Sequence, residues 1–214
     1  SLLLDTGDQR YWRPARLSEA ITLKHQHPGA IVLSGATDTA LRVTKSHEIL
    51  KEIIDVSGLA ELTLLHVEDG EVHIGAGASL TTVVPFVKNA FPALHDMLTV
   101  FGSRQIRNLA TFGGNLGTGA PIGDALPVPM AYGARVALES VGGRREVPLD
   151  SFLKGYRVTA RKVDELITEV IIPRVPSSSR VRSYKVSRRK DLDISTVCGG
   201  FSVELSVDNL VRTI

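Results

Sequence analysis

Glycine and hydroxyl residues gather in one short segment, Val32-Leu-Ser-Gly-Ala-Thr-Asp-Thr39, which follows an apolar run. Gly35 allows the backbone to turn tightly and to approach a ligand. Successive backbone N–H groups in such a turn form a concave anion site, and the start of a following helix adds partial positive charge. With hydroxyl donors at Ser34, Thr37 and Thr39, the segment suits a pyrophosphate. An ordinary strand-to-helix turn with a capping hydroxyl is the alternative interpretation.

A second segment, Ala110 to Pro127, carries five glycines between Gly113 and Gly123, with Asn115 and Asp124 among them. Apolar side chains are interleaved with the glycines, so we expect the segment to pack rather than to act as a flexible linker. Packed backbone with this many glycines predicts left-handed turns or a close approach to a ligand. Asn115 can donate and accept hydrogen bonds, and Asp124 can accept them from ribose hydroxyls. A purely structural loop is the alternative.

The periodicity of the chain predicts the elements that would position these two segments. Helices are expected at Leu17–His27, with Ser18 as a candidate cap, and at Thr39–Thr44, Leu80–Asn89 and Ala93–Phe101. Strands are expected at Ala30–Leu33, Glu52–Val56, Leu166–Ile172, Val181–Ser187 and Thr196–Leu205, and hairpins around Asp69-Gly70 and Gly142-Gly143. The fold is therefore expected to be α+β in two subdomains. Residues 1–60 would form a small parallel α/β unit, and residues 61–214 a larger, mostly antiparallel sheet with helices.

The charge balance gives no global attraction to nucleic acid or anionic membranes, because 25 basic and 23 acidic residues leave a net charge of +2. Cys198 is the only cysteine, so the chain alone can hold neither an internal disulfide nor a cysteine-ligated iron–sulfur cluster. This fits a reducing compartment, and we expect a cytoplasmic protein. No apolar run approaches the length of a membrane span. Asn209–Ile214 reads as a strand without its partner, so a piece of a longer polypeptide is expected.

The histidines show no ligand spacing with carboxylates, and no metal site is expected, since such a site needs several convergent ligands. They are His25, His27, His47, His66, His73 and His95. Only His25 and His27 are close in sequence, and this pair is interpreted as a surface helix end.

The stretch Phe101-Gly-Ser-Arg-Gln-Ile-Arg-Asn-Leu-Ala-Thr-Phe-Gly-Gly-Asn-Leu-Gly117, with Pro121-Ile-Gly-Asp-Ala-Leu-Pro127, resembles the FAD signature of the molybdopterin dehydrogenase family. That family includes xanthine dehydrogenase, aldehyde oxidase and the medium subunit of carbon monoxide dehydrogenase. Ser183 to Ile194 resembles the xanthine dehydrogenase version in particular. The resemblance covers nearly the whole chain from about Tyr11 onward. It implies the two-subdomain FAD-binding fold of the vanillyl-alcohol oxidase (PCMH) type.

The resemblance also implies a set of FAD-binding residues and no catalytic residue, since hydride transfer needs no general acid or base. The pyrophosphate loop would comprise Leu33, Ser34, Gly35, Ala36, Thr37, Asp38 and Thr39, with Ser34 and Ala36 where the family usually has a Gly and an Asn. Phe101 corresponds to an aromatic residue beside the adenine, and Thr111, Gly114 and Asn115 to phosphate and ribityl contacts. Asp124 corresponds to a carboxylate that binds sugar hydroxyls, Ile167 to an apolar backbone contact, and Lys185 to a cation beside the isoalloxazine.

The function implied by the resemblance is that of the FAD domain of a xanthine dehydrogenase-like oxidoreductase. Electrons from purine hydroxylation at a molybdenum centre would pass through [2Fe–2S] clusters to FAD and then to NAD, with oxygen or a quinone as alternative acceptors. An iron–sulfur domain and a molybdopterin-binding subunit would hold the other cofactors, so a hetero-oligomer is expected. The alternatives are a related aldehyde or carbon monoxide dehydrogenase type, a stand-alone flavin reductase of the sugar-nucleotide type, and a non-catalytic nucleotide-binding module.

Overall fold

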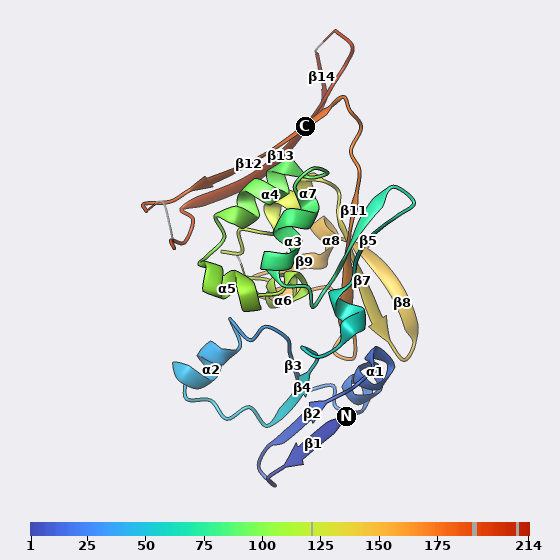
Figure 1. Cartoon of the computed structure of the whole chain (residues 1–214), viewed down its shortest axis with the longest axis vertical. Helices are drawn as coiled ribbons and strands as arrows, with labels where there is room; N and C mark the ends of the chain where they lie inside the picture. The colour runs from blue at the N-terminus through green and yellow to red at the C-terminus, as the bar shows by residue number, and fades with distance from the viewer. Residues whose placement is uncertain (121, 190–191, 209) are drawn as a thin grey trace.

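The computed structural model describes residues 1–120, 122–189, 192–208 and 210–214. Pro121, in the second glycine-rich segment, and Asn209, at the start of the predicted terminal strand, lie outside these residues. The described chain forms a small N-terminal sheet, a larger sheet with helices packed on it, and a long C-terminal ribbon (Figure 1). No helix among these residues is long and apolar enough to cross a membrane.

The N-terminal sheet has the strand order β1-β2-β4-β3. Its members are β1 (Leu2–Asp5), β2 (Arg10–Arg13), β3 (Ile31–Leu33) and β4 (Glu52–Asp55), with helices α1 (Leu17–Gln26) and α2 (Ala40–Thr44) in the connections. β3 and β4 pair in parallel, which confirms the predicted α/β unit, because the segment containing α2 forms the crossover between them. The β1–β2 hairpin is not predicted by the sequence, since Leu2, Leu3 and Leu4 form an exposed apolar run without alternation.

Helix α1 begins after Arg16, whose side chain makes no capping hydrogen bond. The prediction that Ser18 caps this helix is therefore wrong. Ser18 lies inside the first turn, and its carbonyl oxygen accepts a hydrogen bond from Thr22 Oγ1 at 2.9 Å.

The larger sheet has the strand order β5-β6-β11-β7-β8, and every pair in it is antiparallel. Its members are β5 (Leu65–Glu68), β6 (Glu71–Gly75), β7 (Arg135–Ser140), β8 (Gly143–Pro148) and β11 (Leu166–Pro173). Both predicted hairpins are confirmed. Asp69 and Gly70 have φ angles of 48° and 80°, the left-handed values that a tight two-residue hairpin turn requires.

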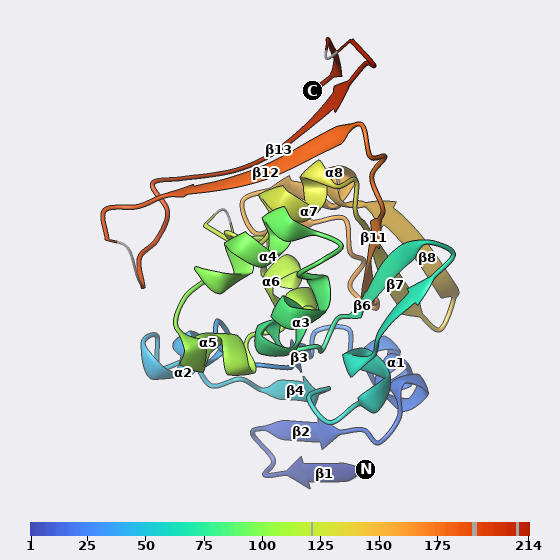
Figure 2. The same ribbon diagram turned by 45° about the horizontal axis from the view of Figure 1, so that its top comes forward.

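Short helices cover one face of this sheet and form the main hydrophobic core with it (Figure 2). They are α3 (Leu80–Val87), α4 (Pro92–Thr99), α6 (Phe112–Thr118), α7 (Pro127–Ala131) and α8 (Leu149–Phe152), while α5 (Arg104–Leu109) has no buried residue and lies outside this core. Leu80, Leu94 and Leu116 come from three of these helices and are buried. They pack in one cluster with Val136 and Val170 of the sheet. Removal of these apolar side chains from water is the main stabilising contribution to this part of the fold.

A second hydrophobic cluster lies on the N-terminal sheet, around Trp12, Ile54 and Leu59. Leu62, in the 3₁₀ helix η1 (Ala60–Thr63), and Leu166, at the start of β11, belong to the same cluster. Because these two residues come from beyond residue 60, packing is shared between the two parts of the chain. The division into subdomains at 1–60 and 61–214 stays a prediction.

The C-terminal sheet has the order β12-β13-β14. Its members are β12 (Ser179–Val186), β13 (Val197–Leu205) and β14 (Val211–Thr213), and a small separate pair joins β9 (Leu153–Gly155) to β10 (Val158–Thr159). β14 pairs with β13, which corrects the expectation that the terminal strand lacks its partner. The ribbon lies at the opposite end of the molecule from the N-terminal sheet, with the helices between them (Figures 1 and 2).

The second glycine-rich segment is helical over Phe112–Thr118, where the sequence predicts left-handed turns or a close approach to a ligand, with a structural loop as the alternative. Thr111 caps this helix, because its Oγ1 accepts the N–H of Gly114 at 3.1 Å. The N–H of Gly113 donates to the carbonyl of Ala76 at 2.9 Å, which docks the helix against the end of β6. Each glycine in a helix costs up to about 1 kcal/mol relative to alanine. Local propensity therefore favours a loop here, and tertiary docking overrides it.

Substitution of Gly113 by alanine tests this docking. A Cβ at Gly113 would lie 2.4 Å from the Cβ of Ala76 and 2.8 Å from its carbonyl oxygen, so backbone must shift. We expect Gly113→Ala to lower the free energy of unfolding by about 1–3 kcal/mol, the usual cost of overpacking. The measurement is denaturant unfolding of the ligand-free protein.

Gly117→Ala is the matched control in the same helix. Its Cβ would meet only the flexible end of Ile167, at 3.2 Å, and alanine is the better helix former. We expect this variant to be at least as stable as the parent. Equal unfolding free energies for the two variants would contradict the docking.

Candidate functional site

A cavity of about 630 Å³ lies between the N-terminal sheet and the helices α5 and α6. Its walls come from the loop between β3 and α2, from α6, and from the start of β11. Cavities of this size hold small-molecule ligands in proteins. Segments far apart in sequence thus meet at one candidate binding site.

The loop between β3 and α2 offers this cavity a row of unpaired donors. Residues 34–39 all line the cavity. Within the described chain, no protein acceptor takes a hydrogen bond from their backbone N–H groups. Ser34 Oγ is also buried without a partner among the described residues. Because buried polar groups without partners are rare in folded proteins, this loop is suited to bind acceptor atoms that the protein does not supply.

Two residues define the shape of this loop. A Cβ at Gly35 would lie only 1.7 Å from the carbonyl oxygen of Leu109, so the loop packs directly on the backbone after α5. Ala36 has a φ of 60°, a left-handed conformation that costs a residue with a Cβ about 1–2 kcal/mol. Asn tolerates this region better than alanine. The backbone at Ala36 is therefore in the conformation that suits the Asn usual in the family.

The opposite wall of the cavity is formed by α6. Asn115 Oδ1 is buried, and no described residue donates a hydrogen bond to it. An amide oxygen is an acceptor, so it suits a hydroxyl or amino group of a ligand. Thr111 Oγ1 accepts the N–H of Gly114 and keeps its own O–H for donation. This wall therefore complements the loop, with an acceptor and a donor facing the same space.

A buried lysine, Lys24, and a half-buried arginine, Arg161, line another part of the cavity. Lys24 is 3% exposed, and its ammonium group donates to the carbonyls of Pro28 and Ala30, each at 2.7 Å. Burial, together with the nearby charge of Arg161, lowers the pKa of Lys24 to about 8. Burial also lowers the pKa of Arg161. An anion in the cavity would relieve the repulsion between these two cations.

Arg157 connects the turn between β9 and β10 to the loop between β3 and α2. Its guanidinium lies 3.3 Å from Asp38 Oδ2, and this hydrogen bond raises the pKa of Arg157. Basic side chains outnumber acidic ones in the cavity wall. The basic members are Lys24, Arg42, Arg157 and Arg161, and the acidic members are Asp38 and Glu165. The balance favours a negatively charged ligand.

The structure brings most of the predicted binding residues to this cavity. Those that line it are Ser34, Gly35, Ala36, Thr37, Asp38, Thr39, Phe101, Thr111, Gly114, Asn115 and Ile167. In the part of the chain that the structure describes, Leu33, Asp124 and Lys185 do not line it. Leu33 ends β3, and its carbonyl accepts the N–H of Val56 at 2.8 Å.

Asp124 and Lys185 form a buried ion pair with each other. Lys185 Nζ lies 2.7 Å from Asp124 Oδ2, and the two side chains are 8% and 9% exposed. Lys185 also donates to the carbonyl of Val100 at 3.2 Å. Since Val100 precedes Phe101, which lines the cavity, the ion pair lies next to this wall. The family resemblance assigns Asp124 and Lys185 to different parts of the cofactor and does not predict their contact.

Cys198 packs against this ion pair, with its Sγ 3.5 Å from the carbonyl oxygen of Asp124. Burial and the neighbouring Asp124 raise the pKa of the thiol to about 11. Because the thiolate is the reactive form of cysteine, Cys198 is inert at neutral pH and contributes packing.

Sequence reasoning missed the basic residues of the cavity. Lys24 lies one helical turn after the buried Ala20 on α1, so a lysine on the core-facing side of the helix was a usable signal. Arg157 and Arg161 lie in an irregular segment without periodicity, and their position depends on tertiary packing. Ala76 and Gly77, after β6, also line the cavity.

The residues present fit a dinucleotide such as FAD. Unpaired N–H groups in a loop before a helix, with basic side chains nearby, match phosphate oxygens. Ser34 Oγ also suits a phosphate oxygen, Asn115 Oδ1 suits a sugar hydroxyl, and Phe101 offers an aromatic surface to a ring.

Comparison with known proteins agrees with this chemistry. Residues 6–175 match the family described as the FAD binding domain in molybdopterin dehydrogenase. The chain is 38% identical over 206 residues to the nicotinate dehydrogenase FAD-subunit of Eubacterium barkeri, covering 92% of this chain and 69% of that relative. It is 32% identical over 203 residues to a putative xanthine dehydrogenase FAD-binding subunit of Escherichia coli, covering 93% and 69%. The xanthine dehydrogenase of Emericella nidulans is 32% identical over 218 residues, which cover 96% of this chain and only 16% of that protein.

Solved structures show the same fold. A carbon monoxide dehydrogenase from Hydrogenophaga pseudoflava that lacks the Mo-pyranopterin moiety superposes with a TM-score of 0.89 at 24% identity, covering 98% of this chain and 74% of that one. Quinoline 2-oxidoreductase from Pseudomonas putida gives a TM-score of 0.84 at 23% identity, covering 92% and 68%. The predicted α+β fold of the PCMH type is thereby confirmed.

Substitution of Gly35 by alanine tests the role of the loop. The new Cβ would overlap the carbonyl oxygen of Leu109, so the loop and its N–H groups must move. We expect Gly35→Ala to weaken FAD binding by about 10- to 100-fold, the equivalent of one charge-assisted hydrogen bond. The measurement is a calorimetric titration of the ligand-free protein with FAD.

Gly29→Ala is the matched control, because Gly29 lines the same cavity and an added Cβ would have no atom within 4 Å. We expect its affinity for FAD to equal that of the parent. The loop assignment fails if both variants bind FAD as tightly as the parent.

Proposed function

Because the chain belongs to the family of FAD-binding domains of the molybdopterin dehydrogenases, we propose that it passes electrons from an iron–sulfur partner through FAD to NAD. FAD can accept single electrons and transfer a hydride, which is the chemistry that connects these two partners. The protein would bind and orient the cofactor and would place charged groups around it. The observation that carries the proposal is the row of unpaired N–H groups at residues 34–39, beside basic side chains in one cavity.

The phosphate groups of FAD would be held by the loop between β3 and α2. The N–H groups of residues 34–39 would donate to phosphate oxygens, with Ser34 Oγ as a further donor. On the opposite wall, Thr111 Oγ1 would donate and Asn115 Oδ1 would accept. The two walls together would fix the cofactor along the cavity.

The ammonium group of Lys185, paired with Asp124, would lie near the flavin ring. The ammonium group has three donors, and Asp124 and Val100 take two of them. The third would donate to the ring, with the carboxylate of Asp124 holding the ammonium in place. A fixed cation in a water-poor site stabilises the negative charge of the reduced ring.

The other redox centres would lie in partner subunits. A [2Fe–2S] cluster usually takes four cysteine thiolates, and this chain has one cysteine, which is half-buried and protonated. The relatives from Eubacterium barkeri and Escherichia coli are both described as FAD subunits, which supports a separate polypeptide for each function. We place the [2Fe–2S] clusters and the molybdopterin in an iron–sulfur partner and a molybdopterin-binding partner.

The substrate of the complete enzyme would be a nitrogen heterocycle oxidised at the molybdenum centre of that partner. The sequence resemblance favours a purine, as in xanthine dehydrogenase. The relatives include a nicotinate dehydrogenase subunit as well as xanthine dehydrogenases, and both substrates are nitrogen heterocycles. These relatives support the flavin subunit over a stand-alone reductase or a non-catalytic nucleotide-binding module.

Anaerobic reduction of the FAD-loaded protein by NADH tests this function. We expect NADH to bleach the yellow absorption of the bound flavin. Lys185→Met should slow this reduction by about 10- to 100-fold, because one charge-assisted interaction with the reduced ring is lost. Lys185→Arg should retain most of the rate, since it keeps the positive charge. The measurement is stopped-flow absorbance.

Lys88→Met is the control for a general loss of positive charge, because Lys88 is exposed at the end of α3. If the bound flavin is reduced by dithionite but not by NADH, the NAD proposal is wrong while FAD binding stands. If the purified protein takes up no FAD, both parts of the proposal fail.

A further inference from the structure

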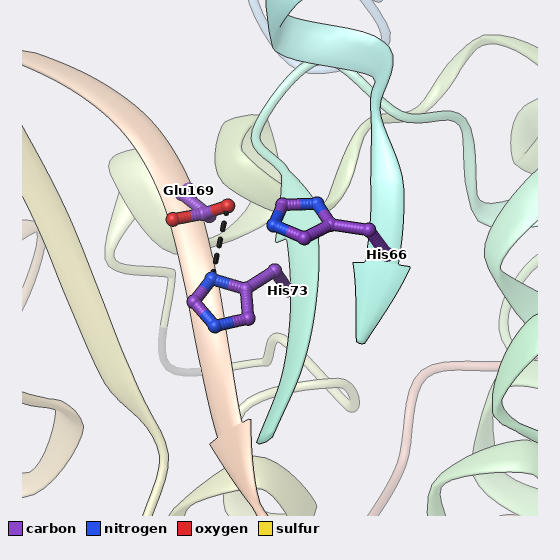
Figure 3. A group of neighbouring side chains, drawn as sticks. All are labelled: His66, His73 and Glu169. Atoms are coloured by element: carbon purple, nitrogen blue, oxygen red, sulfur yellow. Dashed lines mark ion pairs between the residues drawn. The ribbon is translucent and has the colours of Figure 1, made fainter. Parts of the chain in front are cut away.

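Three potential metal ligands converge on the larger sheet, far from any role in FAD binding. His66 lies on β5, His73 on β6 and Glu169 on β11, three strands that are adjacent in the sheet (Figure 3). Each side chain offers one ligand atom, and these atoms all lie within 4.8 Å of one another. The sequence does not predict this group, because the histidines are seven positions apart and the carboxylate comes from the second half of the chain.

Strand pairing places the three side chains on one face. His66 and His73 are directly opposite in the β5–β6 ladder, and Glu169 is opposite Gly75, two residues further along β6. The neighbours of His73 in sequence, Val72 and Ile74, point into the main core. The group therefore lies on the outer face of the sheet, and none of its members lines the cofactor cavity.

The geometry within the group suits a shared cation. His73 Nδ1 lies 3.2 Å from Glu169 Oε1, and the imidazole rings of His66 and His73 are stacked with centroids 4.7 Å apart. Two protonated imidazoles at this distance would repel each other, whereas neutral imidazole is the form that ligates metals. Figure 3 shows the carboxylate and both rings turned toward the same space.

A further residue orients the carboxylate. Arg144 on β8 donates to Glu169 Oε2 at 2.8 Å, so the other oxygen, Oε1, remains on the side of the histidines. Hydrogen bonds of this kind fix metal-ligating carboxylates and are as much a part of metal sites as the ligands themselves. The side chains of His73 and Glu169 are only 12% and 13% exposed, so both are already held by packing.

We propose that His66, His73 and Glu169 bind a divalent transition-metal ion, with Zn²⁺ as the best match, and that water completes the coordination. Two imidazoles and one carboxylate are a common Zn²⁺ ligand set. Tetrahedral bonds of about 2.0–2.1 Å place ligand atoms about 3.4 Å apart, so the group must contract by roughly 1 Å. His66 can supply this movement, because its side chain is 44% exposed.

The bound ion would act as a structural clip. β5 is the edge strand of the larger sheet, and through His66 the ion would tie it across β6 to β11 in the sheet centre. It would take no part in electron transfer, since FAD binding uses the other side of the sheet and the loop between β3 and α2. The alternative is a plain ion pair between Glu169 and a protonated His73.

Titration with Zn²⁺ distinguishes the metal site from a plain ion pair between Glu169 and His73. Chelator-treated protein should bind one Zn²⁺ per chain in a calorimetric titration, and Zn²⁺ should raise its melting temperature. His66→Gln and Glu169→Gln should each weaken this binding by at least about tenfold, and Arg144→Gln by about 10- to 100-fold. His66 is exposed, so His66→Gln should fold normally and bind FAD as the parent does.

His95→Gln is the matched control, because His95 also pairs with a carboxylate, Asp96, but has no second histidine beside it. Its affinity for Zn²⁺ should equal that of the parent. The proposal is overturned if the parent binds no Zn²⁺ at millimolar concentration, or if His66→Gln and Glu169→Gln bind Zn²⁺ as tightly as the parent.

Discussion

The contact of Gly35 with the carbonyl oxygen of Leu109 is the constraint on which the site depends. It brings the backbone of the loop between β3 and α2 directly onto the backbone after α5, with no room for a side chain between them. Residues 34–39 of this loop line the cavity, and their N–H groups have no acceptor among the described residues. This approach fixes the wall of the cavity that carries the unpaired donors.

A glycine also allows close backbone contact on the opposite wall of the cavity. Gly113 allows α6 to dock on Ala76, and Thr111 starts the helix at the point where the cavity begins. The glycines of this segment are thus needed for close contact within the protein as well as for contact with a ligand. The glycines lower the helix propensity of α6, but the docked helix places Asn115 in the cavity wall, where its Oδ1 has no donor among the described residues.

Turn chemistry explains how much of the fold could be predicted from the sequence. The hairpins at Asp69-Gly70 and Gly142-Gly143 follow from residues that tolerate left-handed φ, and the parallel pairing of β3 and β4 follows from the order of elements. Helix α6 could not be predicted, because its stability comes from docking rather than from its own residues. The many glycines from Thr111 to Gly123 have low helix propensity, so the segment resembles a loop in sequence.

Long-range contacts explain what could not be predicted in the site. The residues of the two glycine-rich segments could be assigned to a binding site. Their glycines, which allow close backbone approach, and their hydrogen-bonding side chains are both visible in the sequence. The ion pair between Asp124 and Lys185 spans 61 residues of chain, and the group of His66, His73 and Glu169 needs the register of three strands. Lys24 was also missed, although its position on the buried side of α1 was visible in the helical pattern.

The unpaired N–H groups of residues 34–39 form the proposed phosphate site. Amide hydrogen exchange of the protein with and without FAD measures these groups directly. We expect them to exchange quickly in the ligand-free protein and to become protected when FAD binds, while amides of β8 on the far edge of the larger sheet are unchanged. Binding of FAD with no change in exchange at residues 34–39 would contradict this assignment.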